Sequence, residues 1–484
     1  MSRRSFHPLT LLFSVALLAS SPALAQSPAL GSEGAWLRYA TPSEGGFSTE
    51  ELEHAYHLAD SAGSAAVFAV RDGRVVVAWG GVDRPFEAHS VRKSLVSALY
   101  GIAVEQGLID LDATLAELGI DDREGLTEIE RTARVADLLA ARSGVYHPAA
   151  YSPQSMEEGL PERGSHAPGT FWYYNNWDFN TAGVIFGRET GLHVREAFEE
   201  WIAEPLGMGE FDPDAGFDAL EPSKSDHPAH TFRISARDLA RFGQLYLQDG
   251  RWAGRQIVPT EWVEGSTRLV SEIGSGQGYG LMWWVYPAGT IPADRYPTAS
   301  RYDVVQARGT GGQALYVIPE ADMVVVHRAD TDRGREVSGP AVWTILDRIL
   351  GARTGGPVEE PVLEPVETRP LQGAMPRWEP PELLPLEPEA VRDLLGEYAF
   401  GPDALGRVFV HEGRPFIFVP GRGEAELFAT PDGTITVRVV AGVGIEPVRD
   451  ETGAVTDLLL RLGSEEMRVP KLQEADSPRR SGGR

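Results

Sequence analysis

The sequence contains no cysteine among its 484 residues. Disulfide bonds, zinc sites built on thiolates, a cysteine nucleophile and a lipid-modified N-terminal cysteine are therefore excluded. Beyond residues 1–25, no apolar run approaches the roughly 18 residues that a membrane-spanning helix needs. We therefore expect no membrane span in the mature chain.

Positive charge is also scarce. The chain has 44 lysines and arginines against 70 aspartates and glutamates, which gives a net charge of −26. Such a chain repels nucleic acid and anionic lipid. We expect a small-molecule substrate and no nucleic-acid partner, while the sequence says nothing of the oligomeric state.

Several catalytic motifs are missing. There is no Gly-x-Ser-x-Gly nucleophile elbow and no His-Glu-x-x-His zinc motif. The loop Asp226–His230 has potential metal ligands, but a segment interrupted by proline is more typical of a structural turn. We therefore expect neither a metal nor a cofactor.

The first 25 residues have the pattern of an export signal. Arg3 and Arg4 precede the apolar run 9–18, and Ala23-Leu24-Ala25 is typical of a cleavage site. We predict a signal peptide over residues 1–25 and a periplasmic or secreted protein after cleavage near Ala25. Residues 2–6 also fit the twin-arginine signal, so that route and general secretion both stay open.

Periodicity predicts a large α/β domain over residues 34–352. Residues 67–81 read as two strands around an Arg-Asp-Gly turn, and residues 314–329 as a second hairpin. Residues 236–250 and 341–352 have the period of helices. Strand pairs at both ends with helices between them favour a layered fold whose sheet joins early and late segments.

The composition changes after residue 352. Nine prolines lie between Pro357 and Pro388, so we predict a Pro/Glu-rich linker over residues 353–389. Residues 390–472 alternate apolar and polar side chains, with turns at Glu412-Gly413 and Asp432-Gly433. They predict a small all-β meander or barrel domain. The polar tail 473–484 is expected to be disordered.

Only three residues of the chain are lysines: Lys93, Lys224 and Lys471. Lys93 lies three residues after Ser90, one helical turn away, at the head of a segment that is apolar on nearly every side. Burial lowers the pKa of a lysine by up to about 3–5 units, and a neutral amine beside a serine hydroxyl is a general base. Arginine cannot take this role because its guanidinium stays protonated. The alternative is a capping serine with a surface lysine, but the scarcity of lysine and the buried helix favour catalysis.

Ser-x-x-Lys at the start of a central helix resembles the serine β-lactamase and penicillin-binding-protein superfamily. The segments VADLLAARSGV (135–145) and APGTFWYYNNWDFNTAG (167–183) are similar to its class C and esterase-type branch, and most of all to the 6-aminohexanoate-dimer hydrolase group. The resemblance covers about residues 34–352. It implies a sheet-and-helix serine hydrolase domain, followed here by the small all-β domain, and an acyl-enzyme on Ser90.

The resemblance also assigns a second element. Its tyrosine shares proton transfer with the lysine, and counting from Pro168-Gly169-Thr170 favours Tyr174 for that role, with Asn176 as an orienting group. Tyr173 with Asn175 fits the same pattern, so the register stays open. A phenol beside a cationic amine is expected to have a lowered pKa.

The third element departs from the family pattern. The superfamily has Lys-Thr-Gly or His-x-Gly on an edge strand lining the site, whereas residues 307–320 (ARGTGGQALYVIPE) contain neither lysine nor histidine. Thr310, Gly311, Gly312 and Gln313 most nearly fill the place, and a backbone amide there is expected to join that of Ser90 as an oxyanion hole. Arg308 either replaces the missing cation or points to solvent. The missing residue argues against efficient penicillin recognition.

The sequence therefore predicts an exported serine hydrolase that cleaves a small ester or amide, using Ser90, Lys93 and Tyr174. A D-Ala-peptide carboxypeptidase or a weak β-lactamase is an alternative. A catalytically silent sensor or binding module is a second alternative, from another class of protein. Lys224 either reaches a substrate carboxylate or is a plain surface residue.

Overall fold

The computed structural model describes residues 31, 34–374, 382–402, 404–438, 443–462 and 465–472. The predicted signal peptide and the predicted disordered tail lie outside these residues. Among the helices of the described ranges, none is both long and apolar enough to cross a bilayer.

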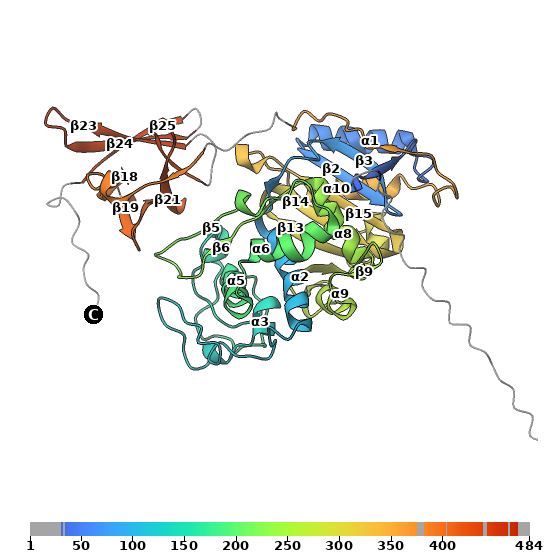
Figure 1. Cartoon of the computed structure of the whole chain (residues 1–484), viewed down its shortest axis with the longest axis horizontal. Helices are drawn as coiled ribbons and strands as arrows, with labels where there is room; N and C mark the ends of the chain where they lie inside the picture. The colour runs from blue at the N-terminus through green and yellow to red at the C-terminus, as the bar shows by residue number, and fades with distance from the viewer. Residues whose placement is uncertain are drawn as a thin grey trace, which may run out of the picture.

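A ten-stranded sheet forms the centre of the first domain (Figure 1). Its strands are β1 (Leu37–Tyr39), β2 (Ala66–Arg71), β3 (Arg74–Gly80), β10 (Ser271–Gly274), β11 (Gln277–Tyr279), β12 (Trp284–Tyr286), β13 (Val304–Gly309), β14 (Gln313–Ile318), β15 (Met323–Arg328) and β16 (Leu363–Pro365). Their order is β10-β11-β12-β13-β14-β15-β2-β3-β1-β16, with β1 and β3 parallel and the other neighbours antiparallel. Because β15 pairs with β2, the sheet joins early and late segments as the sequence predicted.

The two predicted hairpins are confirmed. β2 and β3 meet at Asp72-Gly73, where both residues have positive φ (52° and 68°), the conformation that a tight hairpin turn requires. All six residues of β2 are buried, as are all six of β15. Most residues of these central strands are apolar because helices cover both faces of the sheet, and only Arg71, His327 and Arg328 at the strand ends are charged or polar.

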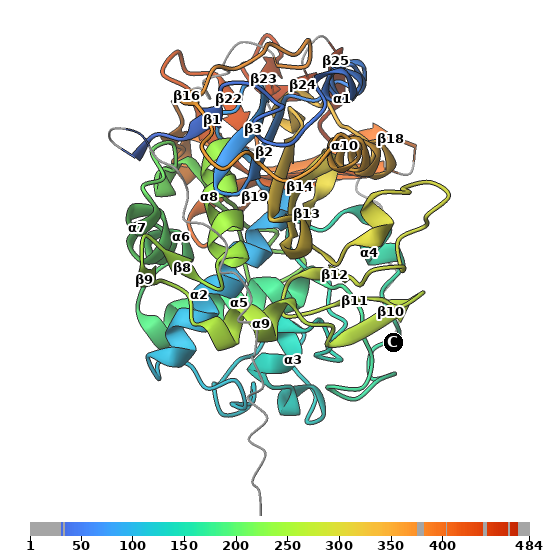
Figure 2. The ribbon, with the colours of Figure 1, turned by 90° about the vertical axis from the view of Figure 1, so that its right-hand side faces the viewer.

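Helices lie on both faces of the sheet. α1 (Thr49–Ser61) and α10 (Gly339–Gly351) lie together on one side, and α8 (Ala236–Leu247) packs on the other (Figure 2). Further helices of this domain are α2 (Arg92–Glu105), α3 (Val135–Leu139), α4 (Gln154–Glu158), α5 (Asn176–Thr190), α6 (Val194–Phe198), α7 (Glu204–Leu206) and α9 (Thr260–Thr267). Both predicted helices, at 236–250 and 341–352, are thereby confirmed.

Short strand pairs connect the helical region to the sheet. Their strands are β4 (Phe86–Glu87), β5 (Asp218–Ala219), β6 (Ala229–His230), β7 (Arg233–Ile234), β8 (Arg251–Trp252) and β9 (Arg255–Gln256). β4 pairs with β7, β5 with β6 and β8 with β9. The β4–β7 pair fixes the chain immediately before Ser90.

The C-terminal domain is a meander of eight antiparallel strands that closes on itself. Its strands are β18 (Gly396–Gly401), β19 (Ala404–His411), β20 (Arg414–Val419), β21 (Gly423–Ala429), β22 (Ile435–Val437), β23 (Val443–Arg449), β24 (Val455–Leu462) and β25 (Glu465–Pro470). A bridge between Tyr398 and Lys471, with a 2.9 Å hydrogen bond from Leu472 N to Glu397 O, joins the last strand to the first. The predicted all-β domain is therefore a closed barrel.

Part of the expected linker belongs to the folded domains. β16 adds a strand to the edge of the large sheet, and Leu371 is buried in its core. Further on, β17 (Leu384–Pro385) pairs with β21 of the barrel. Proline is accepted at an edge strand, which has backbone groups that need no partner on one side. A proline-rich composition therefore did not distinguish an edge strand from a linker.

Candidate active site

Ser90 lies in a short 3-10 turn, His89–Val91, that leads directly into α2. The backbone of His89 is left-handed (φ 47°), a strained conformation for a residue with a side chain. Its imidazole is held on both sides, with Nε2 2.9 Å from Thr331 Oγ1 and Nδ1 3.2 Å from Tyr151 Oη. The surroundings of His89 thus fix the turn that presents Ser90.

Lys93 is buried in the first turn of α2, and its amine meets three side chains. Nζ lies 2.8 Å from Ser90 Oγ, 2.6 Å from Tyr174 Oη and 2.8 Å from Asn176 Oδ1. The lysine is only 2% exposed. α2 is buried around nearly its whole circumference, which is why the one lysine in it is shielded from water.

Burial decides the charge of this cluster. It holds the pKa of Lys93 well below the usual value, and the nearby cations Arg92 and Arg308 lower it further. Burial also raises the pKa of Tyr174. The sequence-based expectation of a lowered tyrosine pKa is therefore wrong, because it assumed a cationic lysine. Burial therefore favours the neutral form of both groups.

A neutral amine fits the three contacts of Lys93. It has two N–H donors and one lone pair, and the oxygen of Asn176 can only accept a hydrogen bond. One N–H therefore goes to Asn176, and the lone pair is left to accept from one of the two hydroxyls. When the lone pair accepts a hydrogen bond from the Ser90 hydroxyl, the second N–H of Lys93 donates to Tyr174 Oη. This arrangement points the proton-accepting orbital at the serine.

The orientation of Asn176 is set from the other side of the site. Its Nδ2 donates to the carbonyl of Tyr151 at 2.7 Å, which leaves Oδ1 facing Lys93. Tyr151 is in turn held by its own amide, which donates to Glu221 Oε1 at 2.7 Å. A loop far along the chain thus positions the amide that contacts the lysine.

The structure separates the two registers of the tyrosine–asparagine motif. Tyr173 Oη donates to Met156 O at 2.7 Å, and the side chain of Asn175 caps α5 through Trp177 N at 3.2 Å. Tyr174 and Asn176 are the pair that reaches Lys93. Tyr173 and Asn175 instead bond to backbone groups beside the site.

Residues 307–320 form a hairpin, not a single edge strand. Thr310–Gly312 is the turn between β13 and β14, and both strands lie inside the sheet. The predicted edge position is therefore wrong. Gly311 (φ 75°) and Gly312 (φ 97°) need the left-handed conformation, since β strands on either side must reverse within three residues.

The turn borders the same cavity as Ser90. This catalytic cavity has a volume of about 650 Å³, and Ser90, Tyr174, Asn176 and Thr310 are among its walls. Gln313 also borders it, but its side chain is buried and bonded to the backbone of Ala329, with Nε2 2.9 Å from the carbonyl. Gln313 therefore braces the turn, whereas Thr310 is exposed in the cavity.

Gly309 is a further residue of the site, which the sequence analysis did not single out. A Cβ at this position would lie 2.6 Å from Ala88 O and 3.2 Å from His89 Cβ. Only glycine lets the end of β13 approach the turn that carries Ser90. In the run Arg-Gly-Thr-Gly-Gly, the sequence does not distinguish Gly309 from Gly311 and Gly312, which form the turn itself.

Arg308 lies in the catalytic cavity with its guanidinium 3.9 Å from the centre of the Trp284 ring. It does not simply point away into solvent. The other two lysines have structural partners: Lys224 Nζ lies 2.6 Å from Glu157 Oε1 and 2.5 Å from Glu221 Oε2, and Lys471 Nζ donates to Asp393 O at 2.7 Å. Lys224 is not among the walls of the catalytic cavity.

One group of side chains in the described ranges has the spacing of metal ligands: His193, Asp218 and His230. Both histidines are within 3.2 Å of Asp218, and Arg195 Nη1 lies 2.8 Å from the same carboxylate. A guanidinium at this distance neutralises the carboxylate that a cation would need. The group is a hydrogen-bonded cluster that joins β5, β6 and the start of α6.

A serine activated by a buried lysine at the head of a helix, beside a mixed sheet with helices on both faces, defines a serine hydrolase. Comparison of the sequence with known families agrees with this class. The chain belongs to the family described as Beta-lactamase, whose sequence model matches residues 50–338.

Individual relatives are distant. An uncharacterized protein of Alkalihalophilus pseudofirmus is 24% identical over 301 residues, which are 56% of this chain and 84% of that protein. A 6-aminohexanoate-dimer hydrolase of Paenarthrobacter ureafaciens is 24% identical over 269 residues, which are 49% of this chain and 64% of the hydrolase. A class C beta-lactamase of Rhodobacter sphaeroides, compared by structure, has a TM-score of 0.45 and 19% identity over 62% of this chain and 99% of that one.

Proposed function

We propose that the protein is an exported hydrolase that cleaves a small carboxylic ester or linear amide through an acyl-enzyme on Ser90. The observation that carries the proposal is the contact of Ser90 Oγ with the amine of Lys93 at 2.8 Å, in a buried place that lowers the pKa of this amine. The similarity to a 6-aminohexanoate-dimer hydrolase supports an amide among the substrates.

In the first half of the reaction, Ser90 Oγ attacks the substrate carbonyl carbon while Lys93 Nζ takes the hydroxyl proton. The carbonyl oxygen becomes an oxyanion, which backbone amides of Ser90 and Thr310 stabilise. The tetrahedral intermediate then expels the alcohol or amine. The proton returns from Lys93 through Tyr174 Oη, which lies 2.6 Å away, to the leaving group.

In the second half, water attacks the acyl-enzyme and gives its proton to the same lysine. Collapse of the second intermediate breaks the bond to Ser90 Oγ, which regains a proton from Lys93 and releases the carboxylic acid. The lysine therefore alternates between base and acid. A pKa far below the usual lysine value suits this task near neutral pH.

Chemical labelling and substitution test this function together. A fluorophosphonate probe should label the wild type at Ser90, and Ser90→Ala should abolish both labelling and turnover of p-nitrophenyl acetate while its melting temperature stays unchanged. A label on another serine would refute the mechanism. An unlabelled, folded and inactive wild type would favour the silent binding module.

The β-lactamase and D-Ala-peptide carboxypeptidase alternatives rest on Arg308, a cation at the end of β13 that borders the catalytic cavity. Its guanidinium is stacked on Trp284 in the cavity. We expect nitrocefin and D-Ala-D-Ala peptides to be cleaved far more slowly than short esters. Turnover of either substrate at a rate comparable with p-nitrophenyl acetate would reverse this ranking.

Export is a proposal that rests on the N-terminal sequence pattern. Arg3, Arg4, the apolar run 9–18 and Ala23–Ala25 support removal of residues 1–25. Mass spectrometry of the protein from cell fractions should find a mature chain that begins near Gln26 outside the cytoplasm. An uncleaved cytoplasmic chain would contradict it.

A further inference from the structure

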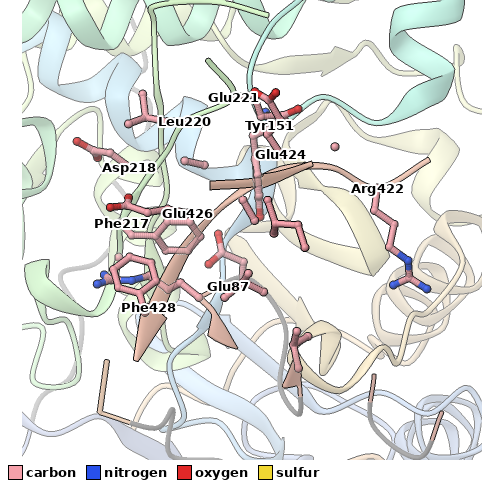
Figure 3. A pocket seen from close by; sticks show the side chains of 18 of the residues that line it. Glu87, Tyr151, Phe217, Asp218, Leu220, Glu221, Arg422, Glu424, Glu426 and Phe428 are labelled. Carbon is pink, nitrogen blue, oxygen red and sulfur yellow. The ribbon is translucent and has the colours of Figure 1, made fainter. Parts of the chain in front are cut away.

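A large cavity lies between the catalytic domain and the barrel. Its volume is about 890 Å³, within the range of small-molecule sites. Figure 3 shows Glu87 and Phe217 of the catalytic domain around the same space as Glu426 and Phe428 of β21. We call it the interdomain cavity.

Direct contacts hold the two domains around this space. Ser223 N donates to Glu424 Oε2 at 2.8 Å, and the guanidinium of Arg438 lies 5.8 Å from the centre of the Phe217 ring. Gly423 (φ 88°) leaves no room for a side chain beside the carboxylate of Glu221, where a Cβ would lie 2.8 Å from Oε2. The barrel is therefore seated on the loop that also holds Tyr151.

The interdomain cavity adjoins the catalytic cavity. His89, Tyr151, Pro153, Thr310 and Glu336 border both spaces. His89 is the residue next to the nucleophile, and Thr310 belongs to the turn opposite it. A molecule whose carbonyl carbon is at Ser90 can therefore extend one of its two arms past these residues toward the barrel.

The far end of the interdomain cavity is apolar. Ile417, Ile445 and Leu460 belong to the barrel core and also line the cavity. Val419, Val437 and Val443 pack against this core but are only half-buried, so the barrel presents apolar surface to the cavity, beside charged side chains such as Arg414 and Glu426. A closed eight-stranded barrel has an interior wide enough for one small ligand.

The near end offers a polar group. Glu87 is buried beside the nucleophile turn, and its Oε1 has no hydrogen-bond partner among the described residues. Its Oε2 is 4.0 Å from Arg233 Nη1. A buried polar atom without a partner is costly and is usually met by water or a ligand.

We propose that the interdomain cavity binds an apolar arm of the substrate, so that the barrel selects esters or amides with an extended alkyl or aryl-alkyl group. This inference rests on the proposed hydrolase function and adds the class of substrate. The reacting carbonyl lies at Ser90, the arm passes His89 and Thr310, which border both cavities, and its end lies against the valines of the barrel. The barrel is thus part of the substrate site.

Two ester series test the inference with the full chain. One series extends the acyl group of p-nitrophenyl esters from acetate through butyrate and hexanoate to octanoate. The other extends the alcohol of acetate esters over the same lengths. In one series kcat/KM should rise by up to about fourfold for each added methylene, the effect of burying that group.

Substitutions in the barrel should remove this rise. Val419→Asn and Val437→Asn place an amide against the proposed arm, so they should flatten the rise of kcat/KM with chain length. Val410→Asn is the matched control, because Val410 is exposed on β19 and does not line the cavity. Melting temperatures identify a variant that fails to fold. If one of the two valine variants does not fold, the length dependence of the other one tests the inference.

The outcomes separate the two proposals. If acetate is cleaved but neither series gains with length, or if the gain persists in both folded valine variants, the inference is wrong and the hydrolase function stands. If no ester is cleaved, the hydrolase function fails. In that case, calorimetry measures the binding of the same esters to Ser90→Ala. The affinity should rise with arm length, and it should fall when Val419→Asn or Val437→Asn is combined with Ser90→Ala.

Discussion

At the scale of single residues, the function of this protein depends on where one lysine is placed. Lys93 lies in a helix that is buried on nearly every side, and its three partners account for every hydrogen-bonding position of a neutral amine. Ser-x-x-Lys predicted the contact of Ser90 with Lys93, and the family resemblance added Tyr174 and Asn176. The sequence could not predict that Tyr174 is neutral as well, because that depends on burial by segments far along the chain.

Replacement of Lys93 by arginine separates charge from proton transfer. Lys93→Arg places a permanent cation at the site, and this cation cannot give up its proton, so ester turnover should fall by at least about 100-fold, nearly as far as in Lys93→Ala. Kinetics should be accompanied by circular dichroism, since a buried guanidinium also threatens folding. A folded arginine variant with activity within about tenfold of wild type would rule out general-base catalysis by Lys93.

Asn176 offers a second test through pH. Asn176→Asp puts a carboxylate next to Lys93, and an opposite charge this close favours the charged amine. The lysine pKa should rise, so the acidic limb of kcat/KM should move to higher pH by about one unit or more. Asn176→Leu is the control, since it removes the hydrogen bond without adding charge. If aspartate and leucine give the same pH profile, the amine does not act as the base.

At the scale of elements, two short turns from opposite ends of the domain build the site. The His89–Val91 turn carries the nucleophile, and the Thr310–Gly312 turn faces it. Periodicity predicted the strands and helices around them well, because burial is repeated along each element. It did not predict the hairpin at 307–320, because glycines occur both in turns and in strands whose backbone a substrate approaches closely.

Gly309 is the point where these turns meet. Gly309→Ala should displace the Thr310 turn, because the added Cβ would lie 2.6 Å from Ala88 O. We expect ester turnover to fall by about ten- to a hundredfold, the cost of misplacing a catalytic group by about an ångström. The control is Gly265→Ala on α9, where nothing lies within 4 Å and which does not border the catalytic cavity. Equal activity of the two folded variants would show that the close approach at Gly309 is not needed.

At the scale of the whole molecule, buried histidines link stability to pH. Burial lowers the pKa of His89 to about 4 and that of His327 to about 4. His327 is bonded to Ser64 Oγ at 2.8 Å and to the carbonyl of Gly312 at 2.7 Å. Between pH 6.5 and pH 4 these residues take up protons when the chain unfolds, so stability is full above about pH 6.5 and falls as the pH drops.

Thermal unfolding between pH 4 and pH 7 measures this effect. His327→Gln keeps hydrogen-bonding groups but removes the titration, so its melting temperature should fall less steeply with acid than that of the wild type. His54→Gln, at an exposed position on α1, is the control. Parallel curves for wild type and His327→Gln would show that this histidine does not contribute to acid sensitivity.

The division into a large α/β domain and a small β domain follows from a change of period in the sequence. The interdomain cavity does not, because it depends on contacts such as Ser223 with Glu424 that join residues 201 positions apart. Edge-strand pairing by the proline-rich segment had no periodic signal either. The sequence therefore predicted the helices and strands, but not the long-range contacts by which they pack together.

The closure of the barrel has a consequence for the order of synthesis. β25 is the last strand of the domain, and Lys471 and Leu472 join it to β18. The chain must therefore be synthesised as far as Leu472 before the barrel can close, whereas every strand of the large sheet has already been made by Pro365. Nascent chains can fold the nucleophile's domain first and acquire the barrel wall of the interdomain cavity last. A premature stop codon between β16 and β18 would leave the catalytic serine in place and remove that wall.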